Sequence, residues 1–182
     1  MRGLLDRLWR SALRVAYRLQ LAWWYLRRPA IHGSYVAVWH GEHVLVIQNS
    51  YRKRLSFPAG GRARGETLLE AARRELREEV GISAPLEELA YYGEFVHHTS
   101  YAEDHGHVFE LRCASAPEVR VDRREVVWAE FLSRDDALAR GVVGVVQLYL
   151  ESIASRAQRA QVSRSEPEAS EDQRLAERRP SG

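Results

Sequence analysis

The chain has 182 residues, of which 45% are hydrophobic and 29% are charged, with 12 glycines and 6 prolines. This composition suits one domain with a hydrophobic core and excludes collagen, a disulfide-rich scaffold and a wholly disordered chain. The 27 basic and 25 acidic residues give a formal net charge of +2, which provides no chain-wide basic field, so no nucleic acid partner is expected.

The single cysteine, Cys113, cannot form an intramolecular disulfide. The sequence also contains neither a cleavable signal peptide nor a long uninterrupted apolar segment. We therefore expect a cytoplasmic protein, with peripheral membrane association as a second option that depends on the N-terminal segment.

Residues 1–30 are predicted to form an amphipathic N-terminal helix. Apolar side chains recur at helical spacing from residue 4 onward, at Leu4, Leu5, Leu8, Trp9, Ala12, Leu13, Ala16 and Tyr17. Arginines recur every three or four residues, and the helix is expected to end before Pro29. Residues 4–26 could lie on an anionic membrane surface, pack on their own domain, or join a second subunit in a homodimer.

The predicted domain covers residues 31–154. A hairpin is expected from strands 35–39 and 44–47, followed by a glycine-rich loop at 58–65, a helix, and strands near 89–98, 107–113 and 126–132. Helices are expected at 134–140 and 144–154. This order predicts an α/β fold with a mixed sheet covered by helices on both sides, and the polar residues 155–182 are expected to be a disordered tail.

The most informative segment is the helix expected after the glycine-rich loop. Thr67 and Glu70 have the spacing of a capping box, and Gly81 is placed to end the helix in the left-handed conformation. Glu75, Glu78 and Glu79 lie within one turn, where like charges destabilise an isolated helix. A hard divalent cation would compensate them, because carboxylate oxygens suit Mg2+ or Mn2+. The alternative interpretation is a solvated acidic face interleaved with arginines.

The spacing of the whole segment resembles the signature of the Nudix hydrolase family. The pattern runs Gly60, five residues, Glu66, seven residues, Arg74-Glu75-Leu76, one residue, Glu78-Glu79, one residue, Gly81-Ile82. Every fixed position of the family pattern is present, although Ala63 stands where many relatives carry a glutamate. The resemblance implies a Nudix-like α/β/α sandwich with a mixed β-sheet, extending more loosely over residues 33–153.

By the same resemblance, the protein is expected to hydrolyse a phosphoanhydride bond in a nucleoside diphosphate linked to another group, with Mg2+ or Mn2+ as cofactor. Glu75, Glu78 and Glu79 would bind metal, with Glu125 as an added acidic ligand. Either Glu79 or Glu75 would accept the proton from the attacking water, and Arg74 would orient a carboxylate. Glu66 is expected to brace the loop.

Further residues are candidates for binding a nucleotide-type substrate. Gly60 and Gly61 would let the loop turn tightly near the metal, and Arg52 and Arg54 could meet phosphate or simply belong to a solvated loop. His98 is a candidate for substrate recognition. The pairs His97-His98 and His105/His107 could also face one another across a hairpin and bind a transition metal, although such histidines more often hydrogen-bond or line a pocket.

The sequence leaves the substrate open among nucleoside triphosphates, nucleotide sugars and related diphosphates, because the secondary marks of several family branches are absent. Two alternatives to a nucleotide hydrolase remain. One is a non-catalytic nucleotide-binding module of Nudix-like fold. The other is a membrane-surface hydrolase of lipid-linked diphosphates, suggested by the basic, tryptophan-rich residues 1–28.

Overall fold

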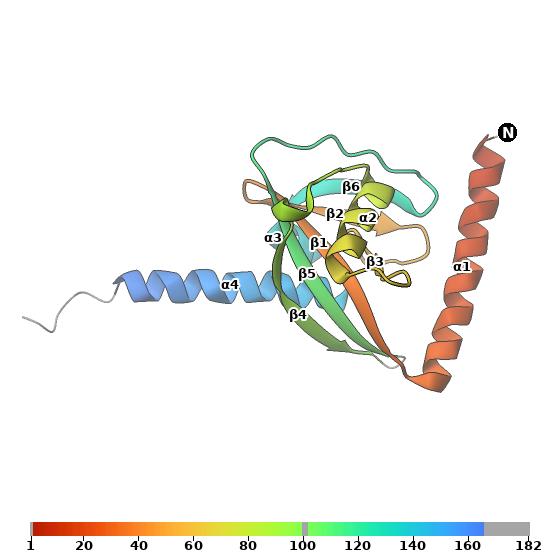
Figure 1. Ribbon diagram of the computed structural model, residues 1–182, viewed down its shortest axis with the longest axis horizontal. Coiled ribbons are helices and arrows are strands. Elements are labelled where there is room, and N and C mark those ends of the chain that lie inside the picture. The colour runs from red at the N-terminus through yellow and green to blue at the C-terminus, as the bar shows by residue number, and fades with distance from the viewer. Residues whose placement is uncertain (1, 100–101, 166–182) are drawn as a thin grey trace, which may run out of the picture. The chain divides into compact units, whose positions relative to one another are not determined.

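The computed structural model describes residues 2–99 and 102–165 of the chain (Figure 1). The elements in chain order are α1 (Arg2–Arg27), β1 (Ala30–His40), β2 (His43–Asn49), β3 (Ala59–Gly61), α2 (Leu68–Val80), a 3-10 turn (Leu86–Glu88), β4 (Ala90–His98), β5 (Glu103–Cys113), β6 (Val126–Ser133), α3 (Arg134–Arg140) and α4 (Gly144–Ser165). The described residues fall into two compact units, the first ending at Tyr149 and the second beginning at Leu150.

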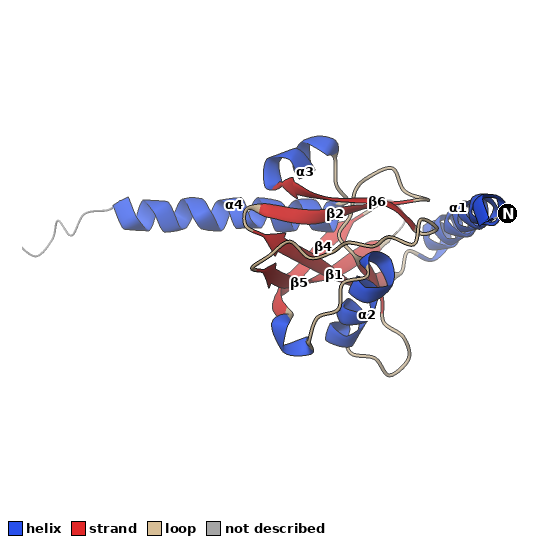
Figure 2. Cartoon of the chain, turned by 90° about the horizontal axis from the view of Figure 1, so that it is seen from above, coloured by secondary structure: helices blue, strands red, loops and turns tan. Residues whose placement is uncertain are grey.

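The first unit is built on a six-stranded mixed sheet, with the strands gathered between α2 and α3 (Figure 2). The strand order is β4-β5-β1-β2-β6, and β3 pairs with the first part of β1. β1 runs parallel to β5, while the other pairs are antiparallel. The predicted mixed sheet is therefore confirmed.

Helical residues cover both faces of this sheet. On one face, the apolar side of α2 packs against alternate residues of β1 and β2 in a cluster of fully buried side chains that includes Val36, Val38, Leu45, Ile47 and Leu76. On the other face, Gly106 of β5 is so close to the start of α4 that a Cβ atom would lie 2.2 Å from Val145. The Trp39 indole N–H donates to the Tyr149 hydroxyl at 2.8 Å on the same side. The predicted α/β/α layering is confirmed.

Most elements lie where the sequence places them. The hairpin is confirmed by the register Trp39↔Val44 and His40↔His43. The glycine-rich loop differs in that residues 59–61 form β3, because Gly60 and Gly61 lie opposite Ser34 and Gly33 of β1.

The expectation of a disordered tail from residue 155 is wrong for residues 155–165, which continue α4 as helix. Arginine, alanine and glutamine are good helix formers, and an established helix extends at little cost. The rest of the predicted tail, residues 166–182, lies outside the described residues.

The helix α1 contacts the rest of the first unit through polar side chains. The Arg10 Nε donates to the carbonyl of Arg123 at 2.9 Å, and Asp6 pairs with Arg124 at 3.1 Å. The Arg14 Nε donates to the Ser50 carbonyl at 3.2 Å, and Tyr17 lies beside Tyr51 with ring centroids 5.1 Å apart. Part of the predicted basic stripe therefore faces the domain. None of the helices that the structure describes is both long and apolar enough to span a membrane.

Candidate active site

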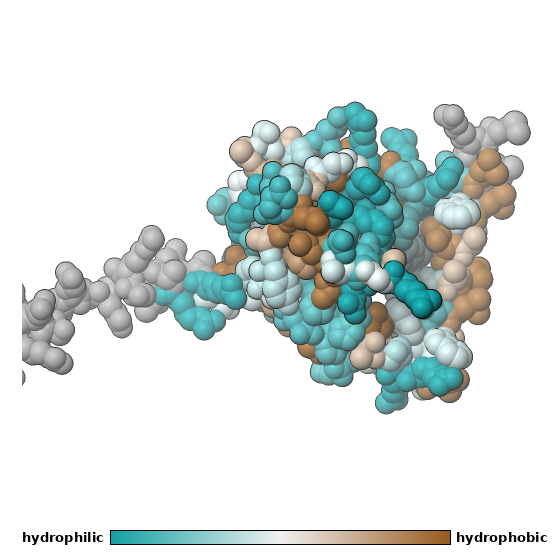
Figure 3. All heavy atoms as spheres, in the orientation of Figure 1, coloured by the Kyte–Doolittle hydropathy of each residue, from teal (hydrophilic) through white to brown (hydrophobic). Residues whose placement is uncertain are grey.

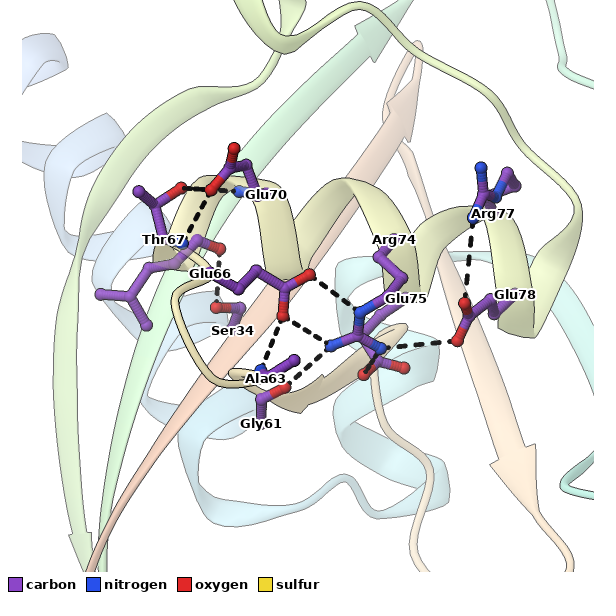
Figure 4. Close-up of polar contacts among 11 residues, drawn as sticks. Ser34, Gly61, Ala63, Glu66, Thr67, Glu70, Arg74, Glu75, Arg77 and Glu78 are labelled. Atoms are coloured by element: carbon purple, nitrogen blue, oxygen red, sulfur yellow. Dashed lines mark hydrogen bonds and ion pairs between the residues drawn. The ribbon is translucent and has the colours of Figure 1, made fainter.

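The helix α2 begins and ends at the residues that the sequence marks. Thr67 Oγ1 accepts the N–H of Glu70 at 3.2 Å, and the Glu70 carboxylate accepts the N–H of Thr67 at 2.8 Å, which completes the capping box (Figure 4). Gly81 ends the helix with a φ of 72°. These caps fix the start and rotation of α2, and so fix which carboxylates it turns toward the sheet.

Glu79 is the buried carboxylate of the group, with 5% of its surface exposed. It accepts the backbone N–H of Ala59 at 2.8 Å and the side-chain amide of Asn49 at 3.3 Å. Burial, together with the nearby charges of Glu75 and Glu125, raises the pKa of Glu79 to about 8 against the lowering effect of these hydrogen bonds. Glu79 is held rigidly at a place where its negative charge is poorly solvated.

Glu75 lies against the glycine-rich loop. Its carboxylate is so close to Gly60 that a Cβ atom there would lie 2.0 Å from Oε1, so only glycine fits at position 60 without a shift. Arg74 Nη1 donates to the same oxygen at 2.6 Å. Burial, with the charges of Glu78 and Glu125, raises the pKa of Glu75, and the Arg74 contact opposes this. Gly60 therefore lies beside a predicted metal ligand.

Arg74 links the loop to the carboxylates. Its Nε and Nη2 donate to the two oxygens of Glu66 at 2.9 and 3.0 Å, a bidentate pair, and Nη2 also donates to the carbonyl of Gly61 at 2.9 Å (Figure 4). Nη1, which also bonds Glu75, lies 3.4 Å from Oε2 of Glu78, whose side chain is about half exposed. Glu66 in turn accepts the N–H of Ala63 at 2.8 Å. Arg74 is thus in contact with three glutamates.

Glu125 comes from the loop before β6 and joins the group from a distant part of the sequence. The Tyr51 hydroxyl donates to its Oε1 at 3.0 Å. Its charge acts on both Glu75 and Glu79. The structure therefore brings all four predicted metal-binding carboxylates to one region, with Tyr51 and Asn49 as polar neighbours that the sequence analysis missed. Neither residue is marked by the sequence around it, because its partner in the site lies 30 or more residues away along the chain.

The donor chemistry of the four carboxylates suits a hard divalent cation. Burial and mutual repulsion raise the pKa values of Glu75 and Glu79. In the part of the chain that the structure describes, neither Glu79 nor Glu125 forms an ion pair with a basic side chain. Oxygen donors with uncompensated charge are the ligands that Mg2+ and Mn2+ prefer.

The remaining predicted site residues are less closely grouped. The Arg52 guanidinium lies over the rings of Tyr17 and Tyr51, 5.3 and 5.5 Å from their centroids. Its Nε is buried and has no hydrogen-bond partner among the described residues. Arg54 is exposed. His98 is also exposed and lies 3.5 Å from Glu103.

Comparison with a family model assigns residues 31–149 to the NUDIX domain. A comparison with curated proteins gives no match. Among solved structures, the MutT protein from Methanosarcina mazei Go1 is similar with a TM-score of 0.62 and 17% identity, over 71% of this chain and 96% of that chain.

Two further structures are similar to this chain. The first is a bifunctional NMN adenylyltransferase/ADP ribose pyrophosphatase from Francisella tularensis, complexed with AMP and a manganese ion. It has a TM-score of 0.60 and 19% sequence identity, and the match covers 79% of this chain and 47% of that chain. The second is the NUDIX domain of Shewanella oneidensis NrtR, complexed with ADP ribose, with a TM-score of 0.60 and 14% identity, over 70% of this chain and 88% of that chain. At these identities the likeness establishes the fold.

Proposed function

We propose that this chain, which belongs to the Nudix family of pyrophosphohydrolases, hydrolyses a phosphoanhydride bond in a nucleoside diphosphate linked to another group and acts in the cytoplasm. The observation that carries the proposal is the convergence of Glu75, Glu79 and Glu125, whose charges act on one another across the site. Burying carboxylates that repel one another lowers the stability of the fold. A module that only binds nucleotide would gain nothing in return.

Glu75, Glu78, Glu79 and Glu125 would hold Mg2+ or Mn2+. When bound, the cation neutralises phosphate oxygens and makes a bound water more acidic. The protein's own contribution is to fix the ligands. Ala59 and Asn49 hold Glu79, the guanidinium of Arg74 holds Glu75 beside Gly60, and Tyr51 holds Glu125. Rigid ligands keep the water and the phosphate in a reactive geometry.

Either Glu79 or Glu75 would accept the proton of the attacking water. In the metal-free protein, burial raises the pKa of both carboxyl groups. Arg74 acts as a positioning residue, because its contacts reach Glu75 and the loop. Glu66 braces that loop through Arg74 and Ala63.

Arg52 is the residue that we assign to phosphate binding. Its Nε is a buried donor without an acceptor among the described residues, and such donors normally have a partner. A phosphate oxygen of the substrate would supply one. Gly61 leaves the loop backbone open to a substrate, whereas Gly60 lies against Glu75. Arg54 and His98 would contact the outer part of the substrate.

The test is a screen for release of phosphate and nucleotide with Mg2+ or Mn2+, using nucleoside triphosphates, ADP-ribose, nucleotide sugars and dinucleoside polyphosphates. Glu79→Gln is the control, because it keeps the shape of the side chain and removes its charge. Hydrolysis of one class by the wild type, lost in the variant, would support the proposal. Binding of nucleotide without hydrolysis would favour the non-catalytic module instead.

A second candidate is a hydrolase that docks on an anionic membrane surface and acts on lipid-linked diphosphates. It is favoured by a stripe of exposed apolar residues on α1, part of which shows as brown spheres at the right of Figure 3. The stripe consists of Leu5, Leu8, Trp9, Val15, Leu19, Trp23 and Leu26, each between 56% and 76% exposed. Steps of three, four or seven residues keep these side chains on one face of the helix.

Charge complementarity favours an anionic lipid surface as the occupant of this stripe. The exposed arginines Arg7, Arg18 and Arg27 belong to the same helix, and tryptophan side chains suit the headgroup region. Asp6, Arg10 and Tyr17 face the domain, so they leave the stripe uncovered. An exposed apolar stripe of this length requires a partner.

Co-sedimentation with vesicles of anionic and of neutral phospholipid tests the docking. Leu19→Gln should weaken binding to anionic vesicles roughly tenfold, as expected for loss of one buried leucine. Tyr25→Gln, an exposed residue outside the stripe, is the matched control and should change binding little. Equal binding by wild type and Leu19→Gln would refute the docking, and a doubled mass in light scattering would assign the stripe to a homodimer.

A further inference from the structure

A second group of side chains that can bind metal shares no residue with the carboxylates of α2. His32 belongs to β1, Glu94 to β4, and His105 and His107 to β5. In the sheet, His32 is directly opposite His105, and Glu94 is directly opposite His107. Residues in register, and residues two apart on a strand, point to the same face. The three strands therefore gather these four side chains on one face.

The distances between their donor atoms are those of a metal site. His32 Nδ1 lies 3.4 Å from His107 Nε2, and His107 Nε2 lies 4.0 Å from Glu94 Oε1. One donor atom from each of these three residues lies within 4.8 Å of the other two. Tetrahedral ligands that are bound to zinc at about 2.0 to 2.1 Å lie roughly 3.3 Å from one another. Small side-chain rotations would bring these donors onto one ion.

The surroundings orient these donors. The outer nitrogen of His107, Nδ1, lies 3.3 Å from the Tyr91 hydroxyl, which leaves Nε2 facing His32 and Glu94. His105 bonds Glu94 Oε1 at 2.6 Å through Nδ1 and Glu103 at 2.7 Å through Nε2. Both nitrogens of His105 are thus in use, so it holds Glu94 and is not itself a ligand. Metal-binding histidines and carboxylates are commonly fixed by such outer hydrogen bonds.

We propose that His32, Glu94 and His107 bind one zinc ion, with a water molecule at the fourth position. Two imidazole nitrogens and one carboxylate oxygen form a donor set typical of zinc, and three protein ligands leave a position open. The carboxylates of α2 offer only oxygen donors, which suit Mg2+ or Mn2+. The zinc site is therefore independent of the proposed hydrolase site in both residues and metal preference.

Zinc content of the full-length, untagged protein tests the proposal. Chelator-stripped protein is dialysed against Zn2+ in the presence of excess Mg2+, and bound zinc is measured by mass spectrometry. Wild type should bind one zinc per chain. His32→Ala and His107→Ala should each bind zinc at least about tenfold more weakly, and His105→Ala about ten- to a hundredfold more weakly.

Two controls locate the zinc. His43→Ala removes an exposed histidine at the start of β2, outside the group, and should bind as the wild type does. Glu79→Gln should also keep its zinc, which distinguishes this site from the carboxylates of α2. Zinc should raise the thermal unfolding midpoint of wild type but not of His32→Ala. Absence of stoichiometric zinc in wild type, or unchanged zinc affinity in both His32→Ala and His107→Ala, would overturn the proposal.

Discussion

The carboxylate of Glu75 occupies the space that a side chain on Gly60 would need, since a Cβ atom at position 60 would lie 2.0 Å from Glu75 Oε1. Gly60 is in β3 and Glu75 is in the middle of α2, so this contact joins the loop to the helix across the proposed metal site. The glycine is required here by its neighbour and not by its own backbone angles, which lie outside the positive-φ region.

Gly60→Ala should displace Glu75 and lower turnover by about a hundredfold, the typical cost of misplacing a reacting group by about 1 Å. Gly93→Ala is the control. Gly93 belongs to β4, outside the proposed site, and a Cβ atom there meets nothing within 4 Å, so this variant should keep nearly full activity. Steady-state kinetics on the substrate found in the screen compares the two, and equal activity of both variants would refute the role given to this contact.

Glu79→Gln should lower turnover by about a hundredfold or more while leaving the fold intact, because the amide loses both the metal-binding charge and the capacity to accept a proton. Glu66→Gln should lower turnover only about tenfold, since Glu66 acts through Arg74 and the loop. Circular dichroism checks the fold of both variants. Wild-type turnover in Glu79→Gln would show that another residue carries the chemistry.

The stability of the metal-free protein should fall as pH rises from about 5 to about 8. The pKa of Glu79 is about 8 in the folded protein, against a reference value of 4.5. Between these values the folded state binds more protons than the unfolded state, so ionisation of Glu79 lowers the free energy of unfolding. The shift from 4.5 to about 8 corresponds to a total loss of roughly 5 kcal/mol, from 1.36 kcal/mol per pKa unit.

Urea denaturation in the presence of a chelator measures this dependence. Glu79→Gln cannot ionise, so its free energy of unfolding should decline much less over the same range and should exceed that of wild type near pH 8. Comparing the two proteins removes the contribution of the titrating groups that do not interact with Glu79. Parallel curves for wild type and variant would contradict the assignment of the slope to Glu79.

Arg74→Lys should reduce turnover about ten- to a hundredfold, the typical effect of losing a residue that orients ligands. Lysine keeps the charge but cannot make the bidentate contact with Glu66 and reach Glu75 as well. Arg77→Lys is the control, because Arg77 is mostly exposed and its ion pair with Glu78 is long, at 3.9 Å. This change should stay within about twofold, and equal loss in both would indicate a general charge effect.

Features that depend on residues close together in the chain could be predicted from the sequence. The capping box of Thr67 and Glu70, the left-handed end at Gly81 and the turn between β1 and β2 are all confirmed. The grouping of Glu75, Glu78 and Glu79 follows from helical spacing alone. Local backbone preferences and the helix period determine these features, and they act over a few residues.

Features that depend on contacts between distant residues were decided by the tertiary structure. The burial of Glu79 follows from its contacts with Asn49 and Ala59, and Tyr51 contacts Glu125 from 74 residues away. The approach of His32 to His107, 75 residues apart, follows from the parallel pairing of β1 with β5. The sequence alone determined which donor groups this protein has. Strand pairing and burial determined which of them meet and how strongly their charges interact, because both depend on the surroundings that the whole fold creates.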